Sequence, residues 1–214
     1  MNKLDYKKVY KDLYMPSTQP MLIEVPMIQY VMVEGCGDPN TSLAYKQALE
    51  LLYGLSYTIK MSKMNKLKPD NYFEYVVPPL EGFWYGKDCY FDGLNITDKN
   101  DFYWKSLIRL PEFVDENIFQ QAKQSLALKK PELDVHKLQY VQIEEGLCVQ
   151  IMHKGSYDEE VTSILKMNDY IKENHLICDI DDKNRFHHEI YLSDPRKAKP
   201  ENLKTVIRHP VRRV

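Results

Sequence analysis

The sequence is poor in the residues on which metal sites and disulfide frameworks depend. Its four cysteines form no C-x-x-C pair and are far apart: Cys36, Cys89, Cys148 and Cys178. This spacing argues against a zinc site and a disulfide scaffold, and it favours reduced thiols in a cytoplasmic protein. The six histidines do not supply a metal site instead, because His187 and His188 are adjacent and would point to opposite faces of a strand. We therefore expect no metal and no cofactor.

Long apolar runs and an excess of one charge are also missing. No run reaches the roughly 20 apolar residues of a membrane helix, and no apolar segment follows the lysine-rich start, so we expect neither a membrane span nor a signal peptide. The formal net charge of -2 gives no electrostatic reason to expect direct nucleic-acid binding. Gly35 and Gly37 lie in an expected turn, but their spacing fits neither G-x-G-x-x-G nor a P-loop.

The composition that remains is that of an ordinary globular chain. The 214 residues are 43% hydrophobic and 28% charged, which is enough for one substantial core or two small ones. The most informative stretch is 186–195 (FHHEIYLSDP), which alternates as a strand does and ends at a proline. Glu189 and Tyr191 share one face of this strand, opposite His188 and Ile190. Without context, the same pattern is typical of a half-buried strand with a solvated polar face.

Periodicity predicts the elements of the first half. We expect helices over 5–14, 43–61 and 115–129, and strands over 27–34, 72–77 and 102–110, with the segment 80–86 forming a hairpin edge. The helix over 43–61 has a core stripe at the helical period: Ala44, Ala48, Leu51, Leu52, Leu55 and Ile59. A second stripe contains Tyr45, Tyr53 and Tyr57. These tyrosines are either boundary residues that keep their hydroxyls wet or one wall of an aromatic cleft.

The second half begins with a predicted hairpin. Strands over 138–143 and 147–153 are separated by the sequence EEG at 144–146. A helix follows whose first turn is acidic, at Asp158, Glu159 and Glu160, and complements the helix dipole. Its expected buried face is Val161, Ile164, Leu165, Asn168 and Ile171. The stretch 186–193 and a strand over 203–208 complete this half.

The two halves repeat one plan of strand, glycine turn, helix, strand and strand. Gly35 and Gly155 are 120 positions apart (155 - 35), and Tyr75 and Tyr191 are 116 apart (191 - 75). We predict a single α+β domain over 1–214, with an N-terminal extension (1–20), a first module (21–134) and a second module (135–214). The modules would form a pseudo-twofold pair, with an antiparallel sheet, helices on one side and a ligand cleft at the seam.

On this plan, Glu189 and Tyr191 would face the glycine-bracketed aromatic run of the first module. That run contains Glu81 beside Phe83 and Trp84, which is a second carboxylate in aromatic company. The simpler interpretation is that these rings only pack a hairpin edge onto the sheet. A carboxylate enclosed by aromatic rings would attract planar cations, and its enclosure would raise its pKa toward the range of a general acid or base.

Several stretches resemble the GyrI-like small-molecule-binding family, which is related to effector-binding domains of multidrug-responsive transcription regulators. They are 78–84 (PPLEGFW), 108–114 (IRLPEFV), 153–160 (HKGSYDEE), 187–196 (HHEIYLSDPR) and 204–208 (KTVIR), and they spread over nearly the whole chain. The resemblance implies two strand-helix-strand-strand modules around an aromatic ligand pocket with a recurring buried glutamate. Glu189 occupies that place. About twenty residues precede the first expected strand, too few for a helix-turn-helix, so we do not expect a transcription factor.

The chain is most similar to the stand-alone subgroup that hydrolyses the strained cyclopropane of spirocyclopropyl DNA alkylators. The resemblance therefore implies a hydrolase. Our hypothesis for its mechanism is that Glu189 positions or deprotonates a water that opens the cyclopropane, while Tyr191 or Tyr157 hydrogen-bonds the substrate carbonyl. Glu81 could share proton transfer, and the ligand-binding candidates are Trp84, Phe83, Tyr157, Tyr45 and Trp104. A non-catalytic binder of hydrophobic or cationic drugs is the alternative. An inhibitor of gyrase acting through its surface is a third class, without support from the charge, and no oligomeric state is indicated.

Overall fold

The computed structural model describes residues 3–64, 69–86, 91–94, 98–181, 183–194 and 197–214. The helices in this part of the chain are α1 (Tyr6–Val9), α2 (Lys11–Tyr14), α3 (Leu43–Lys60), α4 (Glu116–Lys129) and α5 (Val161–Glu173). The strands are β1 (Met21–Cys36), β2 (Leu80–Gly86), β3 (Phe102–Arg109), β4 (Gln139–Lys154), β5 (Leu176–Cys178), β6 (His187–Tyr191) and β7 (Lys204–Arg213). Short 3₁₀ turns connect them: η1 (Met61–Met64), η2 (Lys99–Asp101), η3 (Val135–Lys137), η4 (Tyr157–Glu159) and η5 (Pro200–Asn202). Cys89 lies outside the described residues.

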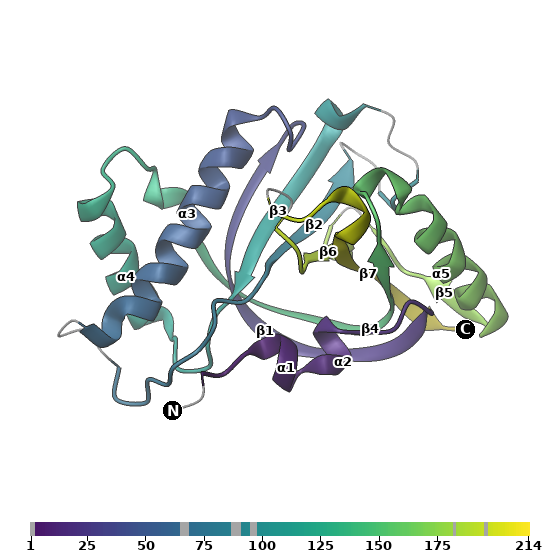
Figure 1. The fold of residues 1–214 in the computed structure, drawn as a ribbon, viewed down its shortest axis with the longest axis horizontal. Coiled ribbons are helices and arrows are strands. Elements are labelled where there is room, and N and C mark those ends of the chain that lie inside the picture. Colours follow the sequence, from purple (N-terminus) through teal and green to yellow (C-terminus); the bar gives the residue numbers. More distant parts are fainter. Residues whose placement is uncertain (1–2, 65–68, 87–90, 95–97, 182, 195–196) are drawn as a thin grey trace.

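The fold is α+β, as predicted, and its antiparallel sheet closes on itself. The strands follow the order β4-β1-β3-β2-β6-β7-β5, and an additional pairing joins β4 to β7. Six strands therefore form a ring, and the short β5 adds to the far end of β7. Figure 1 shows α3 and α5 on the two sides of the strands between them.

The order of pairing is the same in both halves of the chain. In β1-α3-β2-β3, the first strand pairs with the third and the third with the second, and β4-α5-β6-β7 follows the same pattern. The halves meet twice, through β1 with β4 and through β2 with β6. A twofold relation between them and the module boundaries at 21–134 and 135–214 stay predictions.

One row of residues crosses six strands and identifies the face that the helices cover. Directly paired residues of antiparallel strands share a face, and here the row is Val33, Ser106, Gly82, Glu189, Ile207 and Ile151. Ile164 of α5 belongs to one buried apolar cluster with Ile151 and Ile207, while Tyr45 of α3 packs on Trp84 and Trp104. Helices α3 and α5 therefore cover the same face, which we call the helix-covered face, and the third long helix, α4, packs against α3.

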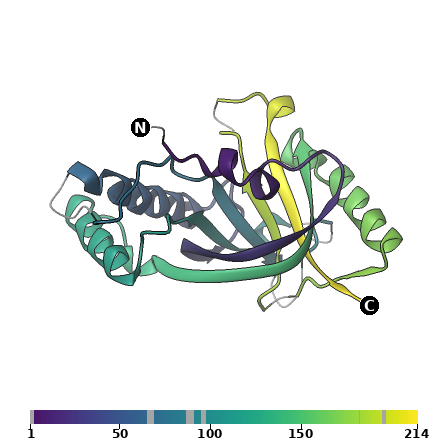
Figure 2. The same ribbon diagram turned by 90° about the horizontal axis from the view of Figure 1, so that it is seen from below.

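The N-terminal helices lie on the opposite face. The chain bends at Tyr10, so the predicted single helix over 5–14 is two short ones, α1 and α2. Gln150 donates a hydrogen bond to the Asp12 carbonyl and Arg208 donates one to the Leu13 carbonyl. The N-terminal segment consequently passes across the sheet beside β6 and β7 (Figure 2).

The predicted hairpin at 144–146 is wrong, because β4 runs without a turn through these residues. Its long partner explains the difference: β1 begins at Met21 and pairs with β4 on both sides of Glu145, with Val25 opposite Gly146. Gly146 has a φ of 64°, which a glycine adopts at low cost, so the strand continues through it. Pro26 lies within β1 but has no N–H for the ladder, so the sequence pattern predicts a strand that begins only after it.

Three smaller predictions are also corrected. The strand over 72–77 is reduced to one parallel bridge between Leu4 and Tyr75, because the N-terminal segment takes its backbone hydrogen bonds. In α5, Met167 is buried while Val161 and Leu165 are 43% and 50% exposed; Ser163 turns inward to contact His153. In α3, Ala44 is exposed and Tyr45 is buried in its place, whereas the rest of the stripe is buried as expected. Every helix in the described ranges is too short or too polar to cross a bilayer.

Candidate active site around Glu189

The Glu189 carboxylate is held at both oxygens on the helix-covered face. Its side chain is 12% exposed. The Tyr191 hydroxyl donates to Oε2 at 2.7 Å, and the His187 Nε2 lies 2.9 Å from Oε1. Because His187, Glu189 and Tyr191 alternate along β6, all three side chains leave the strand on one face. The alternation that the sequence shows therefore becomes a fixed hydrogen-bonded group rather than a solvated polar face.

Trp84 extends this group from the neighbouring strand. Its indole Nε1 donates to the Tyr191 hydroxyl oxygen at 2.9 Å, so the chain of donors runs from Trp84 through Tyr191 to Glu189. Gly82 is paired directly with Glu189 and leaves space for this bond. A Cβ at Gly82 would lie 2.8 Å from the Trp84 Nε1 and 3.3 Å from the Tyr191 hydroxyl oxygen. Only a residue without a side chain fits there.

Two histidines continue from the other carboxyl oxygen. The His187 Nδ1 is 2.8 Å from the Nε2 of His209 on β7. When Glu189 is ionised its oxygens only accept, so His187 carries its proton on Nε2 and His209 donates from Nε2. Burial, and then the nearby His187, holds the pKa of His209 well below its ordinary value. His209 is therefore neutral, and its Nδ1 is buried without a hydrogen-bond partner among the described residues.

Aromatic rings surround the carboxylate. Tyr45 of α3 lies between Trp84, at 6.1 Å between ring centroids, and Trp104, at 5.0 Å. Tyr157 contacts Tyr191 edge to face at 5.9 Å and is 39% exposed, so it forms the rim. Burial and then the charge of Glu189 raise the pKa of Tyr157 to about 12, and the same two causes raise the pKa values of Tyr45 and Tyr191 further. All three phenols are protonated at neutral pH and can donate.

A second carboxyl group, which the sequence indicated only as a helix-dipole partner, lies at this site. Glu160, just before α5, is 7% exposed, and its Oε1 has no hydrogen-bond partner in the described part of the chain. Burial, followed by the charge of Glu189, raises the pKa of Glu160 well above its ordinary value, while Thr205 lowers it. Thr205 is paired with Tyr191 across β6 and β7 and shares its face. Glu160 thus belongs to the helix-covered face.

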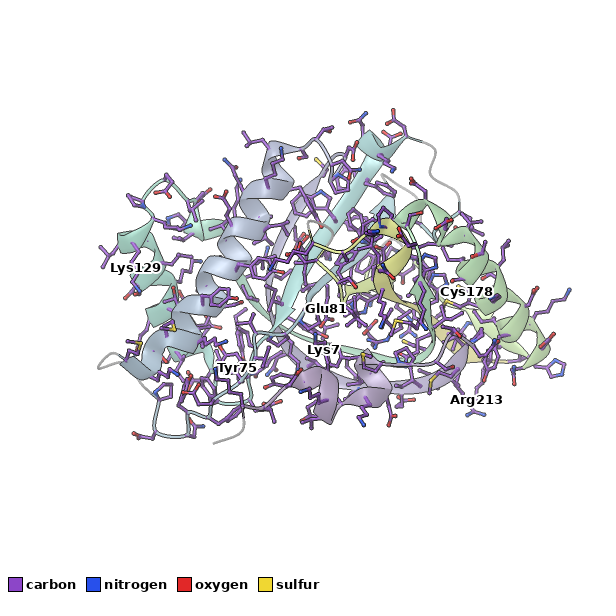
Figure 3. All side chains as sticks on the ribbon, viewed as in Figure 1. Lys7, Tyr75, Glu81, Lys129, Cys178 and Arg213 are labelled. Carbon is purple, nitrogen blue, oxygen red and sulfur yellow. The ribbon has the colours of Figure 1, made fainter. Side chains whose placement is uncertain are left out.

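Glu81 and Phe83 lie on the opposite face. Strand alternation separates them from Gly82 and Trp84, and Glu81 is in the interior, above the N-terminal helices in the view of Figure 3. The Glu81 Oε2 is 3.1 Å from the His188 Nε2, and the Tyr14 hydroxyl donates to its Oε1 at 3.3 Å. Phe83 packs on the His188 ring at 4.4 Å between centroids. The structure therefore brings together Glu189, Tyr191, Trp84, Tyr45, Trp104 and Tyr157, and it places Glu81 and Phe83 elsewhere.

That opposite-face group is a buried charge cluster. His188 lies between Glu81 and Glu145, and Arg208 donates to Glu145 at 2.8 Å and to Gln150 at 3.0 Å. Burial alone would raise the pKa of Glu145, but His188 and Arg208 outweigh it and hold the pKa at about 2. Burial would lower the pKa of His188, yet Glu145 and Glu81 raise it. The charges are paired with one another, which fits an element that fixes the N-terminal segment rather than a ligand site.

The sequence contains only weak signals for the site residues His187 and His209. Alternation places His187 on the same face as Glu189, but no local pattern shows that β6 pairs with β7, which brings His209 to His187. In β7, His209 follows Thr205 and Ile207 at the period of a strand, although Pro210 indicates the end of a strand.

In the described ranges, no three His, Cys, Asp or Glu side chains gather in a way that could hold a metal ion. Two surface hollows lie away from the site, beside α3 and α4 and beside α1 and α2, so a ligand cleft at the seam stays a prediction.

Known crystal structures resemble this chain over nearly its full length. A hydrolase from Listeria innocua is 41% identical, with a TM-score of 0.89 over 98% of this chain and 100% of that chain. An uncharacterized conserved protein from Listeria innocua is 42% identical, with a TM-score of 0.91 over the same shares. The EcmrR C-terminal domain is 15% identical, with a TM-score of 0.51 over 92% of this chain and 98% of that domain, and it shares the fold alone.

The family is shown by the sequence as well. Among proteins with curated descriptions, none matches this chain. The profile of the GyrI-like small molecule binding domain, in contrast, matches residues 18–212. Together with the Listeria innocua structures, this match covers both strand-helix-strand-strand halves and the strand that contains Glu189. The chain belongs to the GyrI-like small-molecule-binding family.

Proposed function

We propose that this protein hydrolyses planar aromatic electrophiles, such as spirocyclopropyl DNA alkylators, with Glu189 as the group that activates water. The observation that carries the proposal is a carboxylate fixed at both oxygens, by His187 and Tyr191, inside a cage of aromatic rings. The hydrolase from Listeria innocua, at 41% identity, supports an enzymatic use of this fold.

Glu189 is suited to accept a proton from water. Each of its oxygens accepts one hydrogen bond within the protein, and a carboxylate oxygen has a second lone pair free. The two bonds hold the carboxylate in one orientation, so a water hydrogen-bonded to it would be held in a fixed position relative to the substrate.

In the proposed reaction, the water oxygen bonds to a methylene carbon of the cyclopropane and the water proton goes to Glu189. The carbon–carbon bond of the strained ring breaks, and its electron pair moves through the conjugated system to the carbonyl oxygen, where negative charge develops. Tyr157 and Tyr191 are protonated donors near this site and would stabilise that charge. No redox partner is needed, because water supplies both the oxygen and the hydrogen that the product gains.

Substrate would be bound through ring contacts. Trp84 and Tyr45 offer flat surfaces, and a ring stacked on them is worth about 0.5–1.5 kcal/mol beyond its buried area. Trp84 is only 5% exposed, whereas Tyr157 is 39% exposed. A substrate would therefore reach Trp84 by displacing Tyr157 from the rim, which makes Tyr157 the residue most sensitive to substrate shape.

The test is turnover of a spirocyclopropyl alkylator by the purified protein, followed by mass spectrometry of the ring-opened, water-added product. We expect Glu189→Gln to lower kcat by at least about 10²-fold, the usual contribution of a general base, while substrate binding stays within a few-fold. Glu144→Gln, at an exposed position of β4, is the matched control and should leave kcat unchanged. Normal turnover by Glu189→Gln would show that the assigned mechanism is wrong.

A non-catalytic binder is the second candidate, and the same cage favours it. An anionic side chain between Tyr45, Trp84 and Tyr157 attracts a planar cation through charge and ring contacts, each ring adding about 0.5–2 kcal/mol. In the experiment above, this function would appear as stoichiometric protection of the alkylator without any product. Loss of that protection in Glu189→Gln would then assign the carboxylate to binding.

A further inference from the structure

Glu160 is the one carboxyl group on the helix-covered face, in the part of the chain that the structure describes, that is buried and has an oxygen without a partner. It is 7% exposed, and its Oε1 makes no hydrogen bond with any described residue. The Thr205 hydroxyl lies beside the carboxyl group and lowers its pKa through a hydrogen bond, but Oε1 is left without a partner. A buried polar atom without a partner is unfavourable, so the free Oε1 favours a substrate or ligand atom as its partner.

Helix capping does not account for Glu160. The cap of this helical segment is made by its neighbours, because Ser156 and Glu159 form a reciprocal capping box in which the Glu159 carboxylate accepts from the Ser156 backbone N–H at 3.0 Å. Glu160 itself has helical backbone angles, with φ -59° and ψ -26°, and no side-chain cap bond. Asp158, the third acid of this turn, is solvent-exposed and pairs weakly with Lys99.

The location of Glu160 is fixed by the strands beneath it. Thr205 on β7 is paired with Tyr191 on β6 and with His153 on β4, so the three side chains stand in one row on the helix-covered face. Glu160 sits over this row, and its charge acts on Glu189, Tyr191 and Tyr157. It therefore faces the same space as the carboxylate of Glu189, from the α5 side, while Tyr45 faces it from the α3 side.

We propose that Glu160 is a second catalytic carboxyl group of this site, which carries a proton and delivers it to the substrate oxygen on which negative charge develops, while Glu189 takes a proton from water. This assignment rests on the hydrolytic function proposed above and names the acid for that reaction. Per turnover, one O–H bond of water breaks at Glu189, one O–H bond of Glu160 breaks at the substrate oxygen, and the proton held by Glu189 returns to Glu160 through solvent. The product gains one water and no electron is exchanged.

The surroundings of Glu160 and Glu189 differ in the way that an acid and a base require. The two oxygens of Glu189 each have a hydrogen-bond partner, His187 at Oε1 and Tyr191 at Oε2. Glu160 has burial and the charge of Glu189 acting against ionisation, with Asp158 adding to them and Thr205 opposing them. The remaining titratable groups around it are Tyr157, Tyr191 and His153, and His153 is engaged with Ser163 Oγ at 2.9 Å and the Ser156 carbonyl at 3.0 Å. A buried carboxyl group that is held against ionisation beside a carboxyl group with partners at both oxygens is the arrangement expected of an acid and a base.

The kinetic test compares Glu160→Gln with Asp158→Asn, the exposed control in the same turn. We expect Glu160→Gln to lower kcat by about 10–10³-fold and to remove the alkaline limb of the pH profile of kcat, because the group that must be protonated is gone. Asp158→Asn should keep kcat within a few-fold and should keep the alkaline limb, moved slightly to lower pH because one neighbouring charge is removed. A Glu160→Gln variant that is folded and keeps the wild-type kcat and alkaline limb overturns the proposal, even if Glu189→Gln is inactive.

A measurement without turnover separates this proposal from the proposed function. In protein labelled with ¹³C at the glutamate carboxyl carbon, the resonance absent from Glu160→Gln identifies Glu160. We expect that resonance to stay in its protonated position at pH 7, and its midpoint to move to lower pH in Glu189→Gln, because the neighbouring charge is removed. Ionisation of Glu160 near pH 4 would overturn the proposal. If the alkylator is not hydrolysed but Glu160 behaves as expected, the hydrolytic function fails and Glu160 remains as a protonated donor to a bound ligand.

Discussion

Gly82 controls how closely the two strands of the site can approach one another. It is paired with Glu189, and the hydrogen bond from Trp84 to Tyr191 passes over its Cα. Its φ is unremarkable, so the requirement for glycine comes from the space that a Cβ would fill and not from backbone strain. The small residue and the two aromatic residues around it therefore form one unit, in which a change at any position alters the support of Glu189.

Gly82→Ala should damage this unit. The added Cβ would lie 2.8 Å from the Trp84 Nε1, so the indole must move and its bond to Tyr191 is lost. We expect a loss of about 1–3 kcal/mol in the free energy of unfolding, measured with urea, because overpacked cores shift their side chains.

Gly54→Ala is the matched control for this substitution. Its Cβ would meet only the tip of the Leu126 side chain, and alanine is favoured over glycine inside a helix by about 1 kcal/mol. We expect it to leave stability within about 1 kcal/mol and ligand binding unchanged. Equal effects of Gly82→Ala and Gly54→Ala would show that the contact between Trp84 and Tyr191 is unimportant.

At the scale of elements, β7 links the two faces of the sheet. Thr205 and His209 point to the helix-covered face, and Arg208 between them points to the opposite face. Arg208 is 1% exposed and contacts Glu145, Gln150 and the Leu13 carbonyl. One strand therefore supports the candidate active site and holds the N-terminal helices.

Arg208→Met tests this second role. Removing the guanidinium leaves the buried Glu145 with His188 as its remaining cationic partner, and it removes the hydrogen bond to the Leu13 carbonyl of α2. We expect unfolding free energy to fall by about 3–5 kcal/mol, as for other broken buried ion pairs. The double variant Arg208→Met with Glu145→Gln should recover part of the loss, because no unpaired charge remains.

The control for β7 is Arg212→Met. Arg212 is 58% exposed in its side chain and lies 3.5 Å from Asp179, so the change should stay within about 0.5 kcal/mol. Limited proteolysis adds a local readout, since cleavage near α2 should become faster only in Arg208→Met. If both variants unfold at the same urea concentration as the wild type, the cluster does not anchor the N-terminal segment.

The sequence predicted the elements best where one local pattern decides. The helices over 43–61 and 115–129 match α3 and α4 within one residue, because their apolar stripes and the N-caps Ser42 and Asp115 are local signals. The glutamates at 144 and 145 and Gly146 have the composition of a turn, yet they lie inside β4, because the pairing with β1 decides there. The closure of the ring through β2 and β6 depends on residues about 107 positions apart, and no local pattern records it.

The candidate site was predicted in part for the same reason. Alternation correctly placed Glu189 and Tyr191 on one face of β6, and the same alternation, applied to β2, would have separated Glu81 from Trp84. Glu160 could not be recognised from its position at a helix start, because capping residues and buried acids look alike in a sequence. Its burial depends on Thr205 and the strands below it.

At the scale of the whole molecule, stability should depend on acid through Glu145. Its folded pKa is about 2, below the ordinary value of 4.5, so it stabilises the fold above the unfolded pKa and loses this contribution as pH falls through the folded one. A displacement of this size corresponds to about 3 kcal/mol. We expect Tm to fall steeply between about pH 4.5 and pH 2.

Glu145→Gln should remove much of that slope, and Glu144→Gln, at the exposed neighbouring position, should keep it. His188 acts with the opposite sign, because its pKa is raised: its contribution is complete below the unfolded pKa and is lost as pH rises through the folded one. Scanning calorimetry from pH 2 to pH 9 measures both limbs. The same acid slope in Glu145→Gln and wild type would contradict this account.

The closed sheet also has a consequence for behaviour at high concentration. A strand at the edge of an open sheet offers its free N–H and C=O groups to other chains and can seed aggregation. Here, the six strands of the ring each have neighbours on both sides, and among the described strands only the three-residue β5 lies outside it. The closed ring therefore disfavours self-assembly by strand addition. Surface residues do not have to block such pairing, so they are free to vary in this respect.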